Sequence, residues 1–344
     1  MTFRAYSRQN CNGDIHTSRG KATLAHELFR RTGALRTVRF LRRKALRILL
    51  YHRFPLATRS ALEQQCAHLR AHYNPVSLTQ VAHWLHNGQP LPANAVAVTV
   101  DDGYRDFFYV AYPIFRQFEI PVTVFLTTSY LDEKCWLWVD EVDYALTRTT
   151  LNRFEIRSAS GDNLEFRLDT AKARAQTASA INGMAKRLPN PKKLELIRDL
   201  MNTLRVSHPE KMPAEYEPLH WDEVRAMTRG GIEFGAHTKT HPILSRLTSQ
   251  NELKIEIEGS KARLEEELGT PVLHFSYPNG MEQDFQPAAV ELVKNSGFQT
   301  AVTAMAGLNL YGCDPFRLSR VPVEPTHPEQ LFQRVAAGFR LNRK

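Results

Sequence analysis

Two short segments, far apart in the sequence, carry the residue types of a metal-dependent hydrolase site. One is Thr99-Val100-Asp101-Asp102-Gly103, with a carboxylate pair after an apolar run, and the other is His237-Thr238-Lys239-Thr240-His241-Pro242. Two imidazoles and one carboxylate suit zinc and leave a coordination position open for water, while a second carboxylate can act as a base. Neither segment is specific alone, because Asp-Asp-Gly is typical of turns and most histidines bind no metal.

Both segments are predicted to follow strands. Ala95–Val100 is small, apolar or β-branched throughout, which is typical of a strand buried on both faces, and the apolar run at 232–236 precedes the histidine segment. Successive strand side chains point to opposite faces, so Asp101 and Asp102 can serve one site only if the chain already turns at Gly103. We therefore expect the two aspartates to have different roles.

The backbone between the two histidines is predicted to be a loop that leads into a helix. Pro242 disfavours the helical region for the preceding residue, His241. The four-residue separation from His237 is compatible with one shared metal in either conformation.

Apolar runs separated by helical patterns indicate an α/β fold, a distorted (β/α)7 barrel. Catalytic groups in such barrels lie at the carboxyl ends of the strands, where both segments are expected. Helical intervals between Leu62, Cys66 and Leu69, and between Ile257, Leu264 and Leu268, predict helices with one buried face. The seven candidate strands lie near 47–52, 96–101, 121–126, 232–236, 272–277, 298–303 and 317–323.

The domain organisation expected is a basic N-terminal arm at 1–47 and a barrel at 48–344. The interval 128–222 is too long for a simple connection, so we interpret it as an inserted helical subdomain. Its tryptophans, Trp136 and Trp138, and Trp221 at its end could stack on sugars, but buried anchoring of the insertion is the favoured interpretation.

The sequence resembles the polysaccharide deacetylase family of carbohydrate esterases, in the subgroup that resembles poly-N-acetylglucosamine deacetylases. The family signature is Thr-Phe-Asp-Asp-Gly followed by His-Thr-x-x-His-Pro, and here only Val100 departs from it. The resemblance runs from about residue 48 to 323 and includes Tyr51-His52-Arg53, Phe275-Ser276-Tyr277-Pro278-Asn279-Gly280 and Pro315-Phe316-Arg317-Leu318-Ser319-Arg320.

The resemblance implies a role for each residue of the two segments. It implies Asp101 as general base, and Asp102, His237 and His241 as ligands of a divalent metal, with zinc as the first candidate. It also implies that the backbone N–H of Asn279 stabilises the oxyanion.

Two family features are missing. The third family motif is usually Arg-x-Pro-Tyr-Gly, and this chain lacks its Arg, which in the family orients the catalytic Asp; Arg317 or Arg320 are candidate replacements. A Leu-x-His pattern near the C-terminus, the usual general acid, is also absent, so His52 is the candidate acid. His327 is interpreted as a surface loop residue.

The expected function is metal-dependent removal of N-acetyl groups from an amino sugar in a polysaccharide or lipid-linked glycan. The alternative is a glycan-binding protein with a decayed deacetylase site, suggested by the missing Arg and His. Adjacent aspartates are poorly placed for a glycosidase, which needs carboxylates about 5 Å or more apart on either side of the bond.

We expect a cytoplasmic location. No apolar run approaches the roughly 18 residues of a membrane span, and the first residues lack the apolar core of a signal peptide. The four cysteines, Cys11, Cys66, Cys135 and Cys313, are scattered, which favours reduced thiols over a disulfide framework.

The N-terminal arm carries the positive charge of the chain. Residues 1–47 hold 12 Lys or Arg against 2 acids, a net of +10, whereas the remainder has a net of −1. Leu24, Leu28, Phe29, Phe40 and Leu41 alternate with basic residues at helical spacing. Two interpretations remain open: contact with an anionic membrane surface at the inner face of the membrane, or a solvated arm packed on the barrel. No nucleic acid is expected as a partner, because no recognised motif accompanies the charge.

Overall fold

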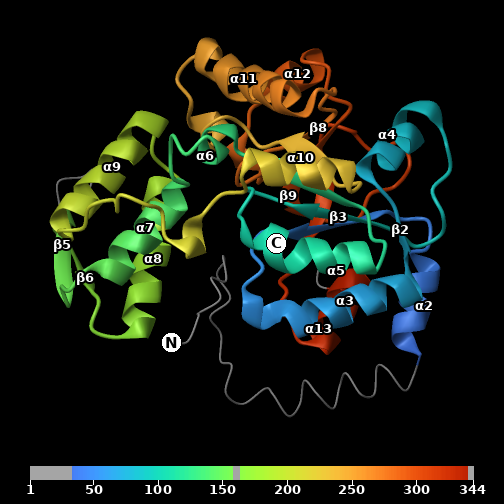
Figure 1. Cartoon of the computed structure of the whole chain (residues 1–344), viewed down its shortest axis with the longest axis horizontal. Coiled ribbons are helices and arrows are strands. Elements are labelled where there is room, and N and C mark those ends of the chain that lie inside the picture. Colours follow the sequence, from blue (N-terminus) through green and yellow to red (C-terminus); the bar gives the residue numbers. More distant parts are fainter. Residues whose placement is uncertain (1–32, 158–162, 340–344) are drawn as a thin grey trace.

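The computed structural model describes residues 33–157 and 163–339, which form a barrel of parallel strands surrounded by helices (Figure 1). The eight-stranded sheet has the order β1-β10-β9-β8-β7-β4-β3-β2, and a further pairing of β1 with β3 closes seven of its strands into a ring. The (β/α)7 barrel predicted from the sequence is confirmed. The strands are β1 (Arg47–Tyr51), β2 (Asn74–Pro75), β3 (Ala95–Val100), β4 (Val122–Leu126), β7 (Glu233–Ala236), β8 (His274–Ser276), β9 (Thr300–Ala306) and β10 (Leu318–Pro322).

The helices around the barrel bury the faces that the sequence patterns predicted. Leu62, Cys66 and Leu69 are all buried, as are Ile257 and Leu264, whereas Leu268 is half-buried. The covering helices are α2 (Ala34–Leu41), α3 (Arg59–His72), α4 (Leu78–Asn87), α5 (Tyr112–Gln117), α6 (Thr128–Leu131), α10 (Trp221–Arg229), α11 (Gln250–Leu268), α12 (Pro287–Asn295) and α13 (Glu329–Ala336). A π-helical turn at Phe107–Ala111 leads into α5, and single 3₁₀ turns lie at Leu56–Thr58, Ala214–Tyr216, Leu244–Arg246 and Glu282–Asp284.

The strands are apolar because they contact both the barrel interior and the surrounding helices. All six residues of β3 are buried, as a parallel strand covered on both faces requires. Charge also enters the interior, since Arg320 in β10 is 1% exposed and Arg47 in β1 is fully buried. Arg47 donates hydrogen bonds to the carbonyl oxygens of Ala45 and Ala336.

The last part of the predicted basic arm therefore belongs to the barrel. In α2, Leu35 is buried, whereas Phe40 and Leu41 are exposed. Leu24, Leu28 and Phe29 lie outside the described residues.

Between β4 and β7 the chain forms a lobe beside the barrel (Figure 1). The lobe leaves the barrel after Leu126, at the carboxyl end of β4. It contains α7 (Trp138–Arg148), α8 (Ala171–Ala185), α9 (Asn190–Thr203) and an antiparallel hairpin of β5 (Arg153–Arg157) and β6 (Asn163–Arg167). The hairpin was not predicted. Trp138 is 3% exposed, consistent with an anchoring role.

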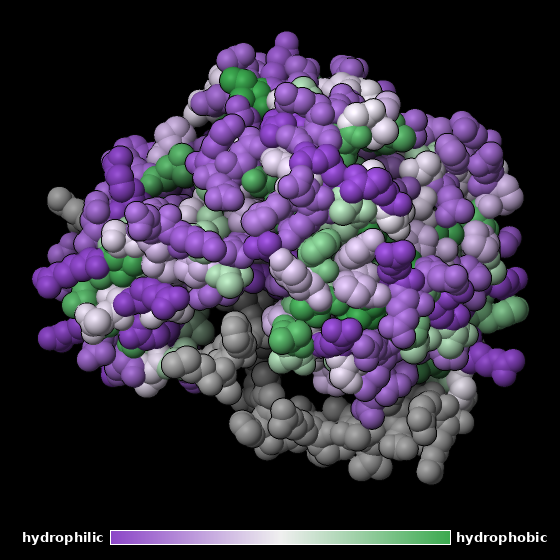
Figure 2. Space-filling view, in the orientation of Figure 1, coloured by the Kyte–Doolittle hydropathy of each residue, from purple (hydrophilic) through white to green (hydrophobic). Residues whose placement is uncertain are grey.

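The outer surface is mainly hydrophilic, with apolar residues scattered over the face seen in Figure 2. Within 33–157 and 163–339, no helix combines the length and the apolar character needed to cross a membrane.

Because β4 packs closely against β7 at Gly235, a methyl group at this position should lower the stability of the protein. A Cβ there would lie 2.5 Å from Cε1 of Phe125 and 2.8 Å from the carbonyl oxygen of His274. Gly235→Ala should therefore lower the free energy of unfolding by about 1–3 kcal/mol in urea denaturation. Gly183→Ala in α8 is the matched control, because its Cβ meets nothing within 4 Å, and it should raise stability by up to about 1 kcal/mol. Equal stability of the two variants would contradict this packing.

Candidate metal centre

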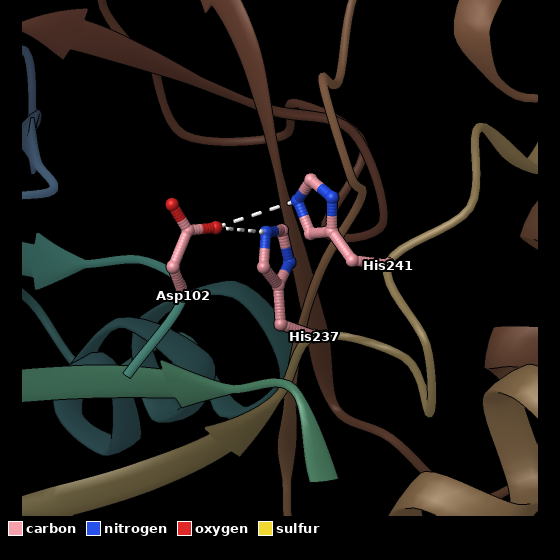
Figure 3. Close-up of side chains that lie close together, drawn as sticks. All are labelled: Asp102, His237 and His241. Carbon is pink, nitrogen blue, oxygen red and sulfur yellow. Dashed lines mark ion pairs between the residues drawn. The ribbon is translucent and has the colours of Figure 1, made fainter. Parts of the chain in front are cut away.

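Asp102, His237 and His241 converge at the carboxyl end of the barrel strands (Figure 3). Oδ1 of Asp102 lies 3.4 Å from Nε2 of His237 and 3.3 Å from Nε2 of His241. Each residue is at most 2% exposed. One ligand atom from each residue lies within 4.8 Å of the other two, so a single ion could contact all three.

The hydrogen bond of His237 sets which ring nitrogen faces the centre. Nδ1 lies 2.7 Å from the carbonyl oxygen of Ser276. A carbonyl only accepts, so Nδ1 carries the proton and donates it, leaving the lone pair of Nε2 directed at Asp102. A histidine that donates to a carbonyl through one nitrogen while the other faces the metal is the usual arrangement of a metal ligand.

The carboxylate of Asp102 has the environment of a group that needs a cation. Both oxygens are buried, and no residue in the described part of the chain donates a hydrogen bond to either. Burial acts to raise the pKa of Asp102, but protonated forms of the neighbouring His237 and His241 would hold that pKa well below its usual value. A buried ionised carboxylate without hydrogen bonds is costly, and a divalent metal would satisfy it. The donor set therefore fits zinc or a related ion.

Left-handed backbone conformations bring these side chains together. Asp102 (φ 78°), Thr238 (φ 66°), His241 (φ 58°) and Asn279 (φ 58°) all have positive φ, and Gly103 (φ 92°) continues the turn after Asp102. The chain thus turns where β3 ends. This turn is the condition under which two adjacent aspartates can serve one site. Left-handed φ costs a residue other than Gly free energy, and such residues cluster at functional sites.

Asp101 is held by Arg320. Nη1 and Nη2 of Arg320 each donate to one oxygen of Asp101 at 2.7 Å, and the hydroxyl of Ser276 donates to Oδ2 at 3.2 Å. Burial acts to raise the pKa of Asp101, but Arg320 together with His237 and His52 outweighs burial, so the pKa lies below its ordinary value and the group is ionised at neutral pH. Asp101 and Asp102 thus have different main partners, although Nε2 of His237 also lies 3.9 Å from Oδ2 of Asp101.

Of the two candidate replacements for the missing motif Arg, it is Arg320 that contacts Asp101. Arg317, the other candidate, lies near the surface beside Asp314, at 3.6 Å. Arg320 also donates to the carbonyl oxygen of Thr303 and to Oγ1 of Thr99.

The two remaining predicted residues follow barrel strands. His52 comes directly after β1, and positive charge on it acts to lower the pKa of both Asp101 and Asp102. Asn279 follows β8, and its backbone N–H donates no hydrogen bond to any residue the structure describes. His327 is half-buried in the turn after β10, where its Nδ1 accepts a hydrogen bond from the N–H of Glu324.

The analysis of the sequence did not identify Glu256. This α11 residue is 7% exposed and accepts hydrogen bonds from the N–H groups of Lys239 (2.9 Å) and Thr240 (2.8 Å) and from the Thr240 hydroxyl (2.6 Å). Glu256 therefore fixes the loop between the two histidines. No local pattern marks it, because the contact joins the loop to a helix further along the chain. The contact of Thr99 with Arg320 could have been predicted from the sequence, because Thr99 lies two residues before Asp101 on the same strand face.

The family model for polysaccharide deacetylase matches residues 88–301. Over 81 residues the chain is 40% identical to poly-beta-1,6-N-acetyl-D-glucosamine N-deacetylase from Escherichia coli strains K12 and O157:H7. The aligned region spans 23% of this chain and only 12% of those relatives.

Solved structures share the fold at low sequence identity. The deacetylase PplD of Streptococcus pyogenes, in complex with acetate, has a TM-score of 0.56 at 17% identity, covering 85% of this chain and 98% of that one. IcaB from Ammonifex degensii has a TM-score of 0.53 at 19% identity, covering 86% and 97%. The BpsB deacetylase domain from Bordetella bronchiseptica has a TM-score of 0.51 at 15% identity, covering 82% and 96%.

The buried pair of Arg320 and Asp101 predicts strong coupling in stability. Arg320→Met should lower the free energy of unfolding by about 3–5 kcal/mol, because it leaves a buried carboxylate unpaired. Adding Asp101→Asn should recover part of this loss, since the charge is then gone. Urea denaturation of the two single variants and the double variant, all with a chelator present, measures the coupling. If the double variant lost as much unfolding free energy as the two single variants summed, the coupling between Arg320 and Asp101 would be contradicted.

Proposed function

Because this chain belongs to the polysaccharide deacetylase family, we propose that it removes N-acetyl groups from an amino sugar in a polysaccharide or lipid-linked glycan. Asp102, His237 and His241 would hold a divalent metal, zinc in the first place. The observation that carries the proposal is the buried Asp102 carboxylate, without hydrogen bonds from described residues and faced by two imidazole Nε2 atoms.

The proposed chemistry divides the work between the two aspartates. The metal would supply Lewis acidity and lower the pKa of water. Asp101, ionised and oriented by Arg320, would accept a proton from the water that attacks the acetamide carbon. The backbone N–H of Asn279 would donate to the oxyanion that forms.

His52 would supply the general acid. It lies at the carboxyl end of β1, where its charge influences both aspartates. Protonation of the leaving nitrogen by His52 would allow the C–N bond to break and release the free amine and acetate.

A polymer of N-acetylglucosamine is the substrate we propose to test first. Support comes from the 81-residue similarity to an enzyme named for such a polymer. The alternative, a glycan-binding protein with a decayed site, was suggested partly by the missing motif Arg, and Arg320 provides the equivalent contact. A glycan that binds without metal-dependent acetate release would favour the alternative.

The cytoplasmic location and the membrane contact of the basic arm stay predictions. Sedimentation of the full chain with anionic vesicles at low and high salt would test the membrane contact.

Asp102→Asn and Asp101→Asn should affect metal and turnover differently. Asp102→Asn should lose bound zinc, because an amide is a poorer ligand than a carboxylate. Asp101→Asn should keep zinc but reduce acetate release by roughly 100-fold or more, because the base is gone. Zinc content by mass spectrometry and acetate release from N-acetylglucosamine oligosaccharides give the two readouts. Equal zinc loss in both variants would refute the assigned roles.

His52→Ala should slow amide hydrolysis far more than ester hydrolysis. A poor leaving group such as an amine needs protonation, so acetate release from an N-acetylated sugar should fall by roughly 100-fold. An activated acetyl ester has a good leaving group and should be much less affected. His83→Ala is the control, because this exposed histidine lies in α4, on the outside of the barrel. Equal losses on both substrates would indicate a structural role for His52.

A further inference from the structure

A cavity of about 450 Å³ lies between the inserted lobe and the loop that carries His241. Trp136, Trp138 and Lys193 line it on the lobe side, and Thr240, the neighbour of His241, lines it on the barrel side. The cavity thus begins one residue from a candidate metal ligand.

The cavity is held against the metal loop by backbone contacts. The N–H of Thr128 donates to the carbonyl oxygen of Thr238 and that of Ser129 to the carbonyl oxygen of Lys239. The N–H of Lys134 in turn donates to the carbonyl oxygen of Ser129. The start of the lobe and the histidine loop therefore form one connected wall.

Lys193 lines the cavity, and its ammonium donates no hydrogen bond to any described residue. The residue is 3% exposed, and its Nζ lies 5.0 Å from the ring centre of Trp138. Burial lowers the pKa of Lys193 to about 8, so its ammonium is still largely charged at neutral pH. The Nε1 of Trp138 also has no acceptor among the described residues, but that atom is shielded from solvent and does not face the cavity. The Lys193 ammonium is therefore the group that calls for an acceptor on a ligand.

The other groups of the cavity suit an uncharged sugar rather than an anion. The carboxylates of Glu256 and Glu141 act to raise the pKa of Lys193, although burial outweighs them, so negative charge is already present beside the ammonium. Glu141, paired with His208 at 2.9 Å, also offers an acceptor for a hydroxyl group. Trp136 is only partly buried and adds an aromatic wall, which suits the apolar face of a pyranose ring.

The cavity continues away from the metal centre. A second cavity, of about 790 Å³, shares Glu141, Leu194 and His208 with the first and extends along α9 to Met201. We call the two together the lobe trough. An extended trough that starts at the metal loop could hold several linked sugars.

We propose that the lobe trough binds neutral sugar residues of the glycan next to the one that loses its acetyl group, with Lys193 donating to their oxygens and Trp136 contacting a sugar ring. The inference rests on the proposed function. In this inference the lobe makes the enzyme prefer an oligosaccharide to a single sugar.

The test uses N-acetylglucosamine oligosaccharides of two to six residues, β-1,4- and β-1,6-linked. For the wild type we expect KM for acetate release to fall by about 10-fold or more from the shortest to the longest member of the accepted series. Lys193→Met and Trp136→Phe should lose most of this gain. Trp84→Phe is the matched control, because Trp84 lies in α4 against Tyr311, outside the trough, and it should keep the gain.

A binding measurement separates this inference from the proposed function. Tryptophan fluorescence titration with the hexasaccharides, with a chelator present, should show saturable binding that each trough variant weakens by about 10-fold. Leu194→Glu, at a half-exposed position of the trough, repeats the test without a buried substitution.

The outcomes are distinct. If the variants release acetate with the same dependence of KM on chain length as the wild type, the trough proposal is overturned and the deacetylase proposal stands. Weakened binding in the variants without acetate release from any of the oligosaccharides would support the trough and overturn deacetylation of these substrates. Absence of both binding and release would contradict both proposals.

Discussion

A buried ion pair between Arg320 and Asp101 organises the end of the barrel where the candidate site lies. Removing two charges from water is costly, and their attraction repays the cost only when the remaining hydrogen bonds are also satisfied. Here Thr99, Thr303 and Ser276 complete the pair, so that β3, β8, β9 and β10 are joined through one polar network. The position of Asp101 therefore depends on the closure of the whole barrel.

This network gives the two adjacent aspartates different environments. Asp101 receives hydrogen bonds from Arg320 and Ser276, while Asp102, turned by its left-handed backbone, faces two imidazoles. Each left-handed residue other than Gly costs about 1–3 kcal/mol, a cost that packing and a bound cation would offset. The arrangement holds a base and a metal ligand side by side.

Much of this was predictable from local sequence. Long buried strands such as β3 are marked by continuous apolar residues, and the strand-end positions of Asp102 and His237 predict that they meet. The choice between Arg317 and Arg320 was not predictable, because a one-residue uncertainty in the start of β10 reverses which side chain points inward.

Contacts between elements that lie far apart in the sequence were even less predictable. Glu256 reaches the histidine loop from α11, and nothing in the local pattern of that helix distinguishes it from other acidic residues. β2 contains only Asn74 and Pro75, too short for any periodicity to appear. Such features depend on the assembled barrel.

Anomalous diffraction from zinc-loaded crystals tests the central claim most directly. We expect one strong peak within about 2.0–2.2 Å of Nε2 of His237, Nε2 of His241 and an oxygen of Asp102. Asp101 should remain bound to Arg320 and outside direct bonding distance of the metal. A peak elsewhere, a peak bonded to Asp101 in place of Asp102, or an empty centre in fully loaded protein would contradict the account.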